Sequence, residues 1–109
     1  MEVLVGKTLT TTGLVEYQSG SIVSRTIVDG AGGDVTLFAI APGEGLSEHT
    51  STRHALALVL EGRAHFTVGE EKMEAGPGDS IAMPANVPHA LEAPVNSSGF
   101  KMMLCLVKP

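Results

Sequence analysis

Hydrophobic residues recur at every second position along most of the chain, and few stretches show the period of a helix. Glycines and prolines interrupt the alternating segments roughly every eight to twelve residues. Short alternating segments separated by turn residues are typical of β-sandwiches and β-barrels. The pattern therefore predicts an all-β protein.

The alternation predicts a series of short strands. The threonine-rich stretch 7–12 is predicted as an edge strand or an arm, and the glycine-rich residues 29–33 as the turn of a hairpin. The segment 35–41 is apolar on both faces, which is typical of a central strand. The remaining predicted strands comprise residues 14–17, 22–28, 55–60, 63–70, 80–83 and 99–107.

The two faces of the strand at 55–60 differ in size, because one carries Ala55, Ala57 and Val59 and the other carries three leucines. His49 and Ser51 have the same odd parity as the small residues. We therefore expect a cavity on the face with the small side chains. The leucine face must be covered by another sheet or by a partner chain, and we expect a homodimer.

Two glycine-anchored segments each place a histidine at a defined spacing. The first spans residues 43–62 and carries Gly43, His49 and Gly62, and the second spans residues 78–93 and carries Gly78, Pro84 and His89. These segments resemble the motifs G-x5-H-x-H-x3-E-x6-G and G-x5-P-x-G-x2-H-x3-N of the cupins. The resemblance implies a double-stranded β-helix, or jelly-roll barrel, with residues 1–109 forming a single cupin domain.

The chain departs from the cupin motifs at three positions, and the first two are ligand positions in the family. Ser51 stands where the second histidine belongs, Ala55 where the glutamate belongs, and Asn86 where a glycine belongs. The resemblance implies that His49 and His89 are metal ligands, and the metal of such a site would be iron, manganese, nickel or zinc. Catalytic metals normally have three protein ligands, so a third donor would be needed.

The third donor could come from one of two other histidines. Alternation places His54 on the leucine face, and only a bulge in residues 50–53 would turn it inward. His65 lies on the next strand, where Ala64 and Phe66 are predicted to face the core, so His65 is expected on the outside. Both histidines are more often surface residues than ligands in such positions.

Two functions fit these residues. One is the binding of a small molecule in the barrel, with His49, Ser51, Ala55, Ala57 and His89 lining the site, and with or without a weakly coordinated divalent metal. The other is a metal-dependent dioxygenase or isomerase that uses the two motif histidines and a third donor. Residue spacing leaves both functions open, and it leaves open whether the protein is an enzyme.

Composition excludes several other classes of function. The net charge is -5 and the pI is about 5.2, so the chain has no basic face for nucleic acid or for anionic lipid. The single cysteine, Cys105, cannot form an intrachain disulfide and is predicted as buried filler in an apolar strand. The amino terminus lacks the pattern of a signal peptide, and we therefore expect a cytoplasmic protein.

Overall fold

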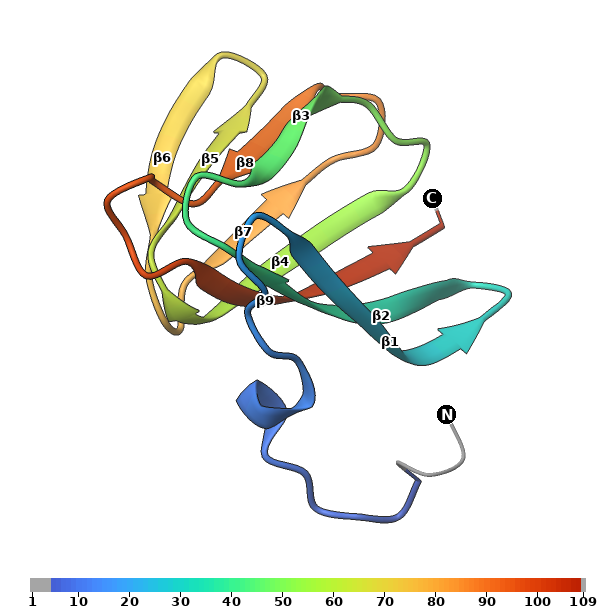
Figure 1. Cartoon of the computed structure of the whole chain (residues 1–109). Coiled ribbons are helices and arrows are strands. Elements are labelled where there is room, and N and C mark those ends of the chain that lie inside the picture. The colour runs from blue at the N-terminus through green and yellow to red at the C-terminus, as the bar shows by residue number, and fades with distance from the viewer. Residues whose placement is uncertain (1–4, 109) are drawn as a thin grey trace.

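A computed structural model describes residues 5–108, which form two antiparallel sheets packed face to face (Figure 1). The order of strands is β1-β2-β9-β4-β7 in the larger sheet and β3-β8-β5-β6 in the smaller one. In this described part the nine strands are β1 (Ile22–Gly30), β2 (Gly33–Ile40), β3 (Gly45–His49), β4 (His54–Gly62), β5 (Ala64–Val68), β6 (Glu71–Ala75), β7 (Ser80–Met83), β8 (His89–Glu92) and β9 (Phe100–Val107). This architecture is the predicted all-β jelly-roll barrel. The single-domain prediction also includes residues 1–4 and 109, which lie outside the described residues.

Alternation along β4 sorts its side chains as the sequence predicts. Ala57 and Val59 are fully buried between the sheets, whereas Leu56 on the opposite face is 44% exposed. Phe66 and Phe100 fill the barrel near Val59, and their ring centroids lie 6.2 Å apart. Large side chains therefore close one end of the barrel, and Ala55 lies at the other end of β4.

Two turn residues require a left-handed backbone. Gly62 has a φ of +80° at the end of β4, and a Cβ atom there would overlap the carbonyl oxygen of Gly99 and lie 2.8 Å from Cα of Phe100. Asn86 is the one residue other than glycine with a positive φ, 66°, among residues 5–108. Asparagine adopts this conformation more easily than most residues, so it can replace the glycine of the cupin motif.

The amino-terminal segment is the arm that was one of the two alternatives predicted for residues 7–12, and the strand predicted at 14–17 is absent. Neither 7–12 nor 14–17 forms a strand; residues Thr11–Leu14 form a short 3-10 helix, η2, and the segment crosses the outer face of the five-stranded sheet as an arm (Figure 1). Val15 packs on this face against Leu37 and Ala39. Threonine favours strands locally, but the segment pairs with no edge strand, so side-chain packing determines its course.

The outer face of the five-stranded sheet also holds an unexpected lysine. Lys101 is only 5% exposed, and its ammonium group donates a hydrogen bond to the carbonyl oxygen of Thr12, 2.6 Å away. The same ammonium lies 5.1 Å from the centroid of the Tyr17 ring. Lys101 therefore fastens the arm to the sheet. Cys105, predicted as buried filler, is only half-buried on this face.

The remaining strand predictions are confirmed in outline. The residues 29–33 connect β1 to β2 as a hairpin in which Gly30 pairs with Gly33. Strand β2 pairs with β1 on one side and with β9 on the other, as expected of a central strand. Among residues 5–108 there is no helix with the length and apolar character needed to cross a bilayer.

Candidate functional site

A cavity of about 510 Å³ lies between the two sheets at the end of the barrel opposite Phe100. Its walls are mostly apolar, and its polar lining comes from histidine, serine and threonine side chains. The lining residues are Leu46, His49, Thr50, Ser51, Thr52, Ala55, Met83, His89, Leu91, Leu104 and Leu106. A volume of this size is within the range of small-molecule sites.

The small side chain of Ala55 helps to create this space. Ala55 pairs in register with Met83 on β7 and with Leu106 on β9, and all three side chains line the cavity. A methyl group at this position leaves open the volume that a longer side chain would occupy. The cavity therefore lies where the cupin motif would place its glutamate.

Two histidines face each other at the cavity. His49 at the end of β3 and His89 at the start of β8 are register partners, and their rings meet edge to face with centroids 4.3 Å apart. His49 is exposed, whereas His89 is only 7% exposed. The pairing of two strands thus brings together the two histidines that the motifs place forty residues apart.

Backbone carbonyls fix the tautomer of both rings. Nδ1 of His49 lies 2.7 Å from the carbonyl oxygen of Ser47, and Nδ1 of His89 lies 3.2 Å from that of Val87. A carbonyl oxygen only accepts hydrogen bonds, so each Nδ1 must carry the proton and donate it. In the neutral rings Nε2 is then an unprotonated acceptor.

Nε2 of His89 is open to the cavity. This atom has no hydrogen-bond partner among the described residues. Every buried side-chain nitrogen or oxygen of residues 5–108 does have a partner, so Nε2 of His89 is not a buried atom. The atom must therefore be accessible to solvent, and His89 lines the cavity. The site thus presents at least one free acceptor inside a mostly apolar space.

Ser51 joins the two loops that border the cavity. Its carbonyl oxygen accepts a hydrogen bond from the backbone N–H of Asn86, 2.7 Å away, and its hydroxyl oxygen accepts one from the N–H of Arg53 at 3.0 Å. The left-handed conformation of Asn86 occurs in this connection between β7 and β8. Ser51 thus combines a lining position with a structural role.

The other predicted site residues lie elsewhere. Ala57 is fully buried and does not line the cavity, because the core around Phe66 and Phe100 fills the barrel at its level. His54 is exposed, and its Nδ1 accepts a hydrogen bond from the backbone N–H of Ala85 at 3.0 Å. The structure therefore brings His49, Ser51, Ala55 and His89 together and separates Ala57 and His54 from them.

The sequence pattern of the cupin domain family matches residues 36–106, which is more than half of the chain. The chain is a cupin. Several solved structures are similar to it, and no match was found among curated proteins. A conserved protein of unknown function from Streptococcus pyogenes is 35% identical, with a TM-score of 0.86 over 95% of this chain and 89% of the other.

Two further cupin structures agree with this assignment. A cupin 2 conserved barrel domain protein from Leptotrichia buccalis is 38% identical, with a TM-score of 0.83 over 89% of this chain and 46% of the other. A cupin superfamily protein from Desulfitobacterium hafniense is 27% identical, with a TM-score of 0.86 over 95% of this chain and 93% of the other. The fold is shared over nearly the whole length of this cupin.

The donors in this cupin do not make up a three-ligand metal centre. His49 and His89 could supply two imidazole nitrogens, but no cluster of three histidine, cysteine, aspartate or glutamate side chains suits a metal anywhere in residues 5–108. The hydroxyl of Ser51 and the methyl of Ala55 stand where the family has a histidine and a glutamate. A resident metal with three protein ligands does not fit these residues.

The apolar lining of the cavity was not predicted. Met83, Leu104 and Leu106 come from β7 and β9, and every residue of β9 after Lys101 is apolar, so alternation does not show which side chains face inward. Lys101 is the one residue of β9 whose polarity indicates which face of the strand it occupies. Because it lies on the outer face, it assigns the even-numbered residues from Met102 onward to the inside.

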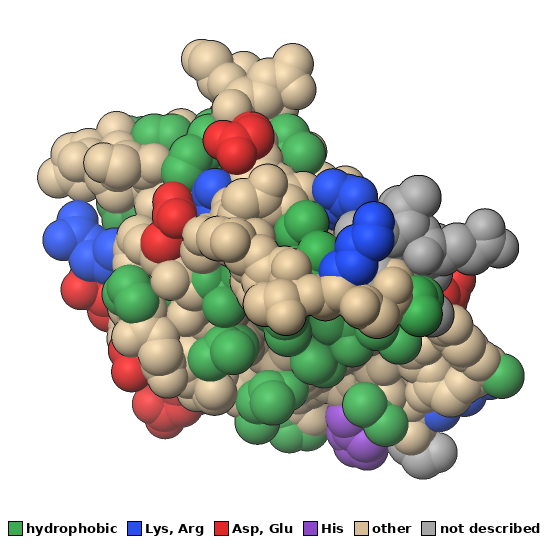
Figure 2. All heavy atoms as spheres, turned by 90° about the horizontal axis from the view of Figure 1, so that it is seen from below, with side chains coloured by type: hydrophobic (Ala, Val, Ile, Leu, Met, Phe, Trp, Pro, Cys, Tyr) green, Lys and Arg blue, Asp and Glu red, His purple; other side chains and the backbone are tan. Residues whose placement is uncertain are grey.

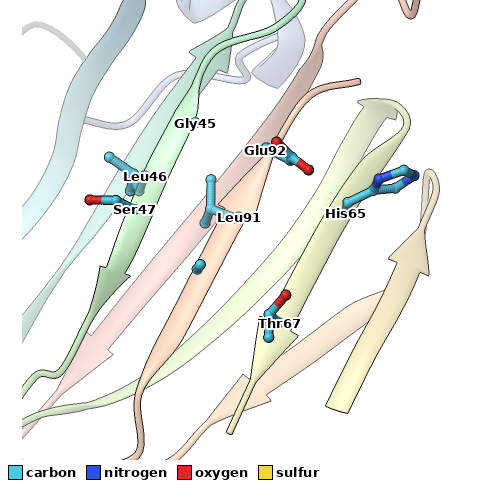
Figure 3. Close-up of a pocket in the computed structure, with 8 residues that line it drawn as sticks. Gly45, Leu46, Ser47, His65, Thr67, Leu91 and Glu92 are labelled. Atoms are coloured by element: carbon cyan, nitrogen blue, oxygen red, sulfur yellow. The ribbon is translucent and has the colours of Figure 1, made fainter. Parts of the chain in front are cut away.

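A second hollow, of about 380 Å³, lies over the outer face of the four-stranded sheet (Figure 3). It is lined mainly from β3, β5 and β8, and Gly45 at its edge allows β3 to approach β8 closely, because a Cβ atom there would lie only 2.8 Å from Cα of Glu92. His65 lies at its side, and its Nε2 is 3.1 Å from a carboxylate oxygen of Glu74. His65 is therefore on the outside of the barrel, as predicted, and pairs with a neighbouring strand.

Proposed function

We propose that this cupin binds a small organic molecule in the barrel cavity, with an apolar body against the leucines and a hydrogen-bond donor at the histidine pair. The ligand class is an alcohol, phenol or amine of the size of a single ring or a short chain. The bound molecule would place its donor at Nε2 of His89 or His49 and its hydrocarbon part beside Met83 and Leu104.

One observation carries this proposal. The backbone carbonyls of Ser47 and Val87 hold both histidines as Nδ1–H tautomers, which leaves Nε2 as an acceptor at a mostly apolar cavity. Nε2 of His89 is accessible to solvent, so a ligand hydroxyl or amine would replace water at this acceptor, and such a hydrogen bond contributes a net of about 0.5–1.5 kcal/mol. Apolar walls with a few polar groups are the usual composition of small-molecule sites.

A matched pair of probes tests the proposal. 4-Ethylphenol has a ring and a hydroxyl donor, whereas ethylbenzene has the same body without the hydroxyl. We expect 4-ethylphenol to shift the methyl NMR signals of Met83 and Leu104, and to bind about two- to tenfold more tightly than ethylbenzene because one hydrogen bond contributes about 0.5–1.5 kcal/mol. His89→Ala should remove this preference.

The control variant is His65→Ala, which changes a histidine on the outside of the barrel. It should leave the affinity for both probes unchanged. The proposal would be abandoned if the shifted methyl signals lay outside the cavity, or if His89→Ala kept the full preference for the phenol.

A metal-dependent dioxygenase or isomerase is the second candidate function. Its support is the Nδ1–H tautomer of both rings, because metal-bound histidines commonly donate their other ring N–H to a carbonyl oxygen. The missing third protein ligand counts against it, and a substrate would have to supply the remaining donors. Elemental analysis of freshly purified protein, without a histidine tag or chelator, tests this candidate. About one transition metal per chain, lost in His49→Ala, would favour it, and an empty wild-type protein would exclude it.

A further inference from the structure

His54 is an exposed histidine that does not line the cavity. It is the first residue of β4, and alternation places it on the same outer face as Leu56. Figure 2 shows the molecule from below, where hydrophobic side chains form a broad band with histidine atoms at its margin. Although its ring is exposed, His54 makes a specific contact with the backbone of the connection between β7 and β8.

This contact requires one tautomer of the His54 ring. The backbone N–H of Ala85 donates a hydrogen bond to Nδ1 of His54 at 3.0 Å, so Nδ1 carries no proton and Nε2 carries it in the neutral ring. His49 and His89 have the opposite tautomer, because Nδ1 of each ring donates to a backbone carbonyl. His54 therefore acts as an acceptor toward the backbone, whereas the two cavity histidines act as donors.

The connection between β7 and β8, residues 84–88, is fixed relative to the start of β4. It begins and ends with proline, which restricts the backbone at both ends. Its first two N–H groups bond to the opposite border of the cavity, since Ala85 donates to His54 and Asn86 donates to the carbonyl oxygen of Ser51, 2.7 Å away. Two adjacent hydrogen bonds thus determine where the next carbonyl group of the connection lies.

That next carbonyl group, of Val87, accepts the hydrogen bond that sets the tautomer of His89. Its oxygen lies 3.2 Å from Nδ1 of His89. This distance is at the upper end of the range for N–H···O bonds, and a displacement of about 0.4 Å would leave no hydrogen bond. His49 is less sensitive to such a displacement, because the carbonyl oxygen of Ser47 lies only 2.7 Å from its Nδ1.

We propose that His54 is a positioning residue for His89. By accepting the N–H of Ala85, it holds the β7–β8 connection where Val87 fixes the Nδ1–H tautomer of His89, and Nε2 of His89 stays an acceptor at the cavity. This role rests on the proposed function, since the acceptor matters only to a ligand that donates a hydrogen bond to it. In a released ring the proton could move to Nε2, and the site would then favour ligands that accept.

Three substitutions of His54 test the role of its acceptor. His54→Leu removes the acceptor, His54→Asn places a side-chain oxygen near the position of Nδ1, and His54→Gln places one near the position of Nε2. ¹⁵N NMR of protein with labelled histidine, at about pH 8.5 where the rings are neutral, reports which nitrogen of His89 carries the proton. The signals of His89 are identified by their loss in His89→Ala.

We expect the proton of His89 on Nδ1 in the wild-type protein and in His54→Asn. In His54→Leu and His54→Gln, the ratio of the two tautomers should shift toward Nε2–H by about two- to tenfold, which corresponds to the loss of one hydrogen bond. The preference for 4-ethylphenol over ethylbenzene should fall in parallel. His65→Leu is the matched control, because it changes a histidine on the outside of the barrel and should leave the tautomer of His89 unchanged.

Three results would overturn the positioning role of His54. They are a wild-type His89 with its proton on Nε2, a tautomer ratio unchanged by both His54→Leu and His54→Gln, and a shift in His54→Asn as large as that in His54→Leu. The NMR measurement uses no ligand, so it is independent of the binding experiment. If the tautomer of His89 follows His54 but neither probe binds, the positioning role stands and the proposed ligand class is wrong.

Discussion

Restoring the two missing ligands of the cupin motif should turn the cavity into a metal site. The variant combines Ser51→His with Ala55→Glu, and both positions line the cavity together with His49 and His89. If these four positions converge on one point of the cavity, the variant would present three imidazoles and one carboxylate to a single ion. Such a set suits divalent transition metals.

Without metal, the double variant should be less stable than the wild type. Ser51→His removes the hydrogen bond from the N–H of Arg53, which contributes about 1 kcal/mol. Ala55→Glu places a carboxylate where the native side chain is only 7% exposed, at a cost of about 1–3 kcal/mol. The expected loss of about 2–4 kcal/mol corresponds to roughly 8–16 °C in Tm for a chain of 109 residues.

Adding metal should reverse this loss in the variant alone. A metal that binds only the folded state stabilises it by about 2.7 kcal/mol at one hundred times its Kd, which restores roughly 11 °C. Differential scanning fluorimetry with and without Ni²⁺ or Zn²⁺ measures the effect, and elemental analysis gives the stoichiometry. The control combines Ser51→His with Ala55→Gln, which keeps the size of the side chain and removes its charge, and it should recover much less.

Two results would refute this reasoning. A double variant that binds metal no better than the wild type would show that the four positions do not converge on one point. A wild-type protein whose Tm already rises strongly with stoichiometric metal would show that an unrecognised third donor completes the site.

Three further predictions concern the fold. Gly62→Ala should lower the free energy of unfolding by more than about 3 kcal/mol, because steric overlap adds to the left-handed strain. Gly78→Ala should cost only about 1–2 kcal/mol, because there is open space around Gly78, whose φ is also positive at +90°. Equal losses of stability in urea titrations would contradict the packing at Gly62. Asn86→Gly should change the free energy of unfolding by less than about 1 kcal/mol, whereas Asn86→Ala should lower it by about 1–2 kcal/mol because of the positive φ. If glycine costs more than alanine, the asparagine side chain itself stabilises the loop. Burial and the hydrogen bond to Glu61 raise the pKa of Tyr17, so the unfolded chain ionises first. The contribution of Tyr17 to stability should therefore be constant below about pH 10 and fall above it. Ultraviolet titration of this single tyrosine at its ordinary pKa of about 10, without unfolding, would disprove the contact.

The sequence was sufficient to predict which face of a strand a residue occupies. Alternation placed Ala55 and Val59 inside and Leu56 outside, and it placed His65 on the outer face of the barrel. The spacing of the motif glycines also identified His49 and His89, which the structure pairs across two strands. These features depend on local periodicity and fixed turns, and both are visible in a single sequence.

Depth within the barrel could not be predicted in this way. Ala55 and Ala57 share a face, but only Ala55 reaches the cavity, because side chains from β5 and β9 fill the space at the level of Ala57. The choice between an edge strand and an arm for residues 7–12 was also left open, since threonine-rich residues favour strands wherever a partner strand exists. In each case the outcome depends on contacts between residues far apart in the sequence.

The position of β9 has a consequence for the biosynthesis of this protein. Strand β9 lies between β2 and β4, although it follows both in the chain. While the ribosome is still translating residues 63–99, β2 and β4 each present a hydrogen-bonding edge that waits for the same partner. At elongation rates of about 5–20 residues per second this interval lasts on the order of seconds, during which the nascent chain can pair with other chains. The yield of folded protein should therefore depend on translation speed and on chaperones that shield these edges.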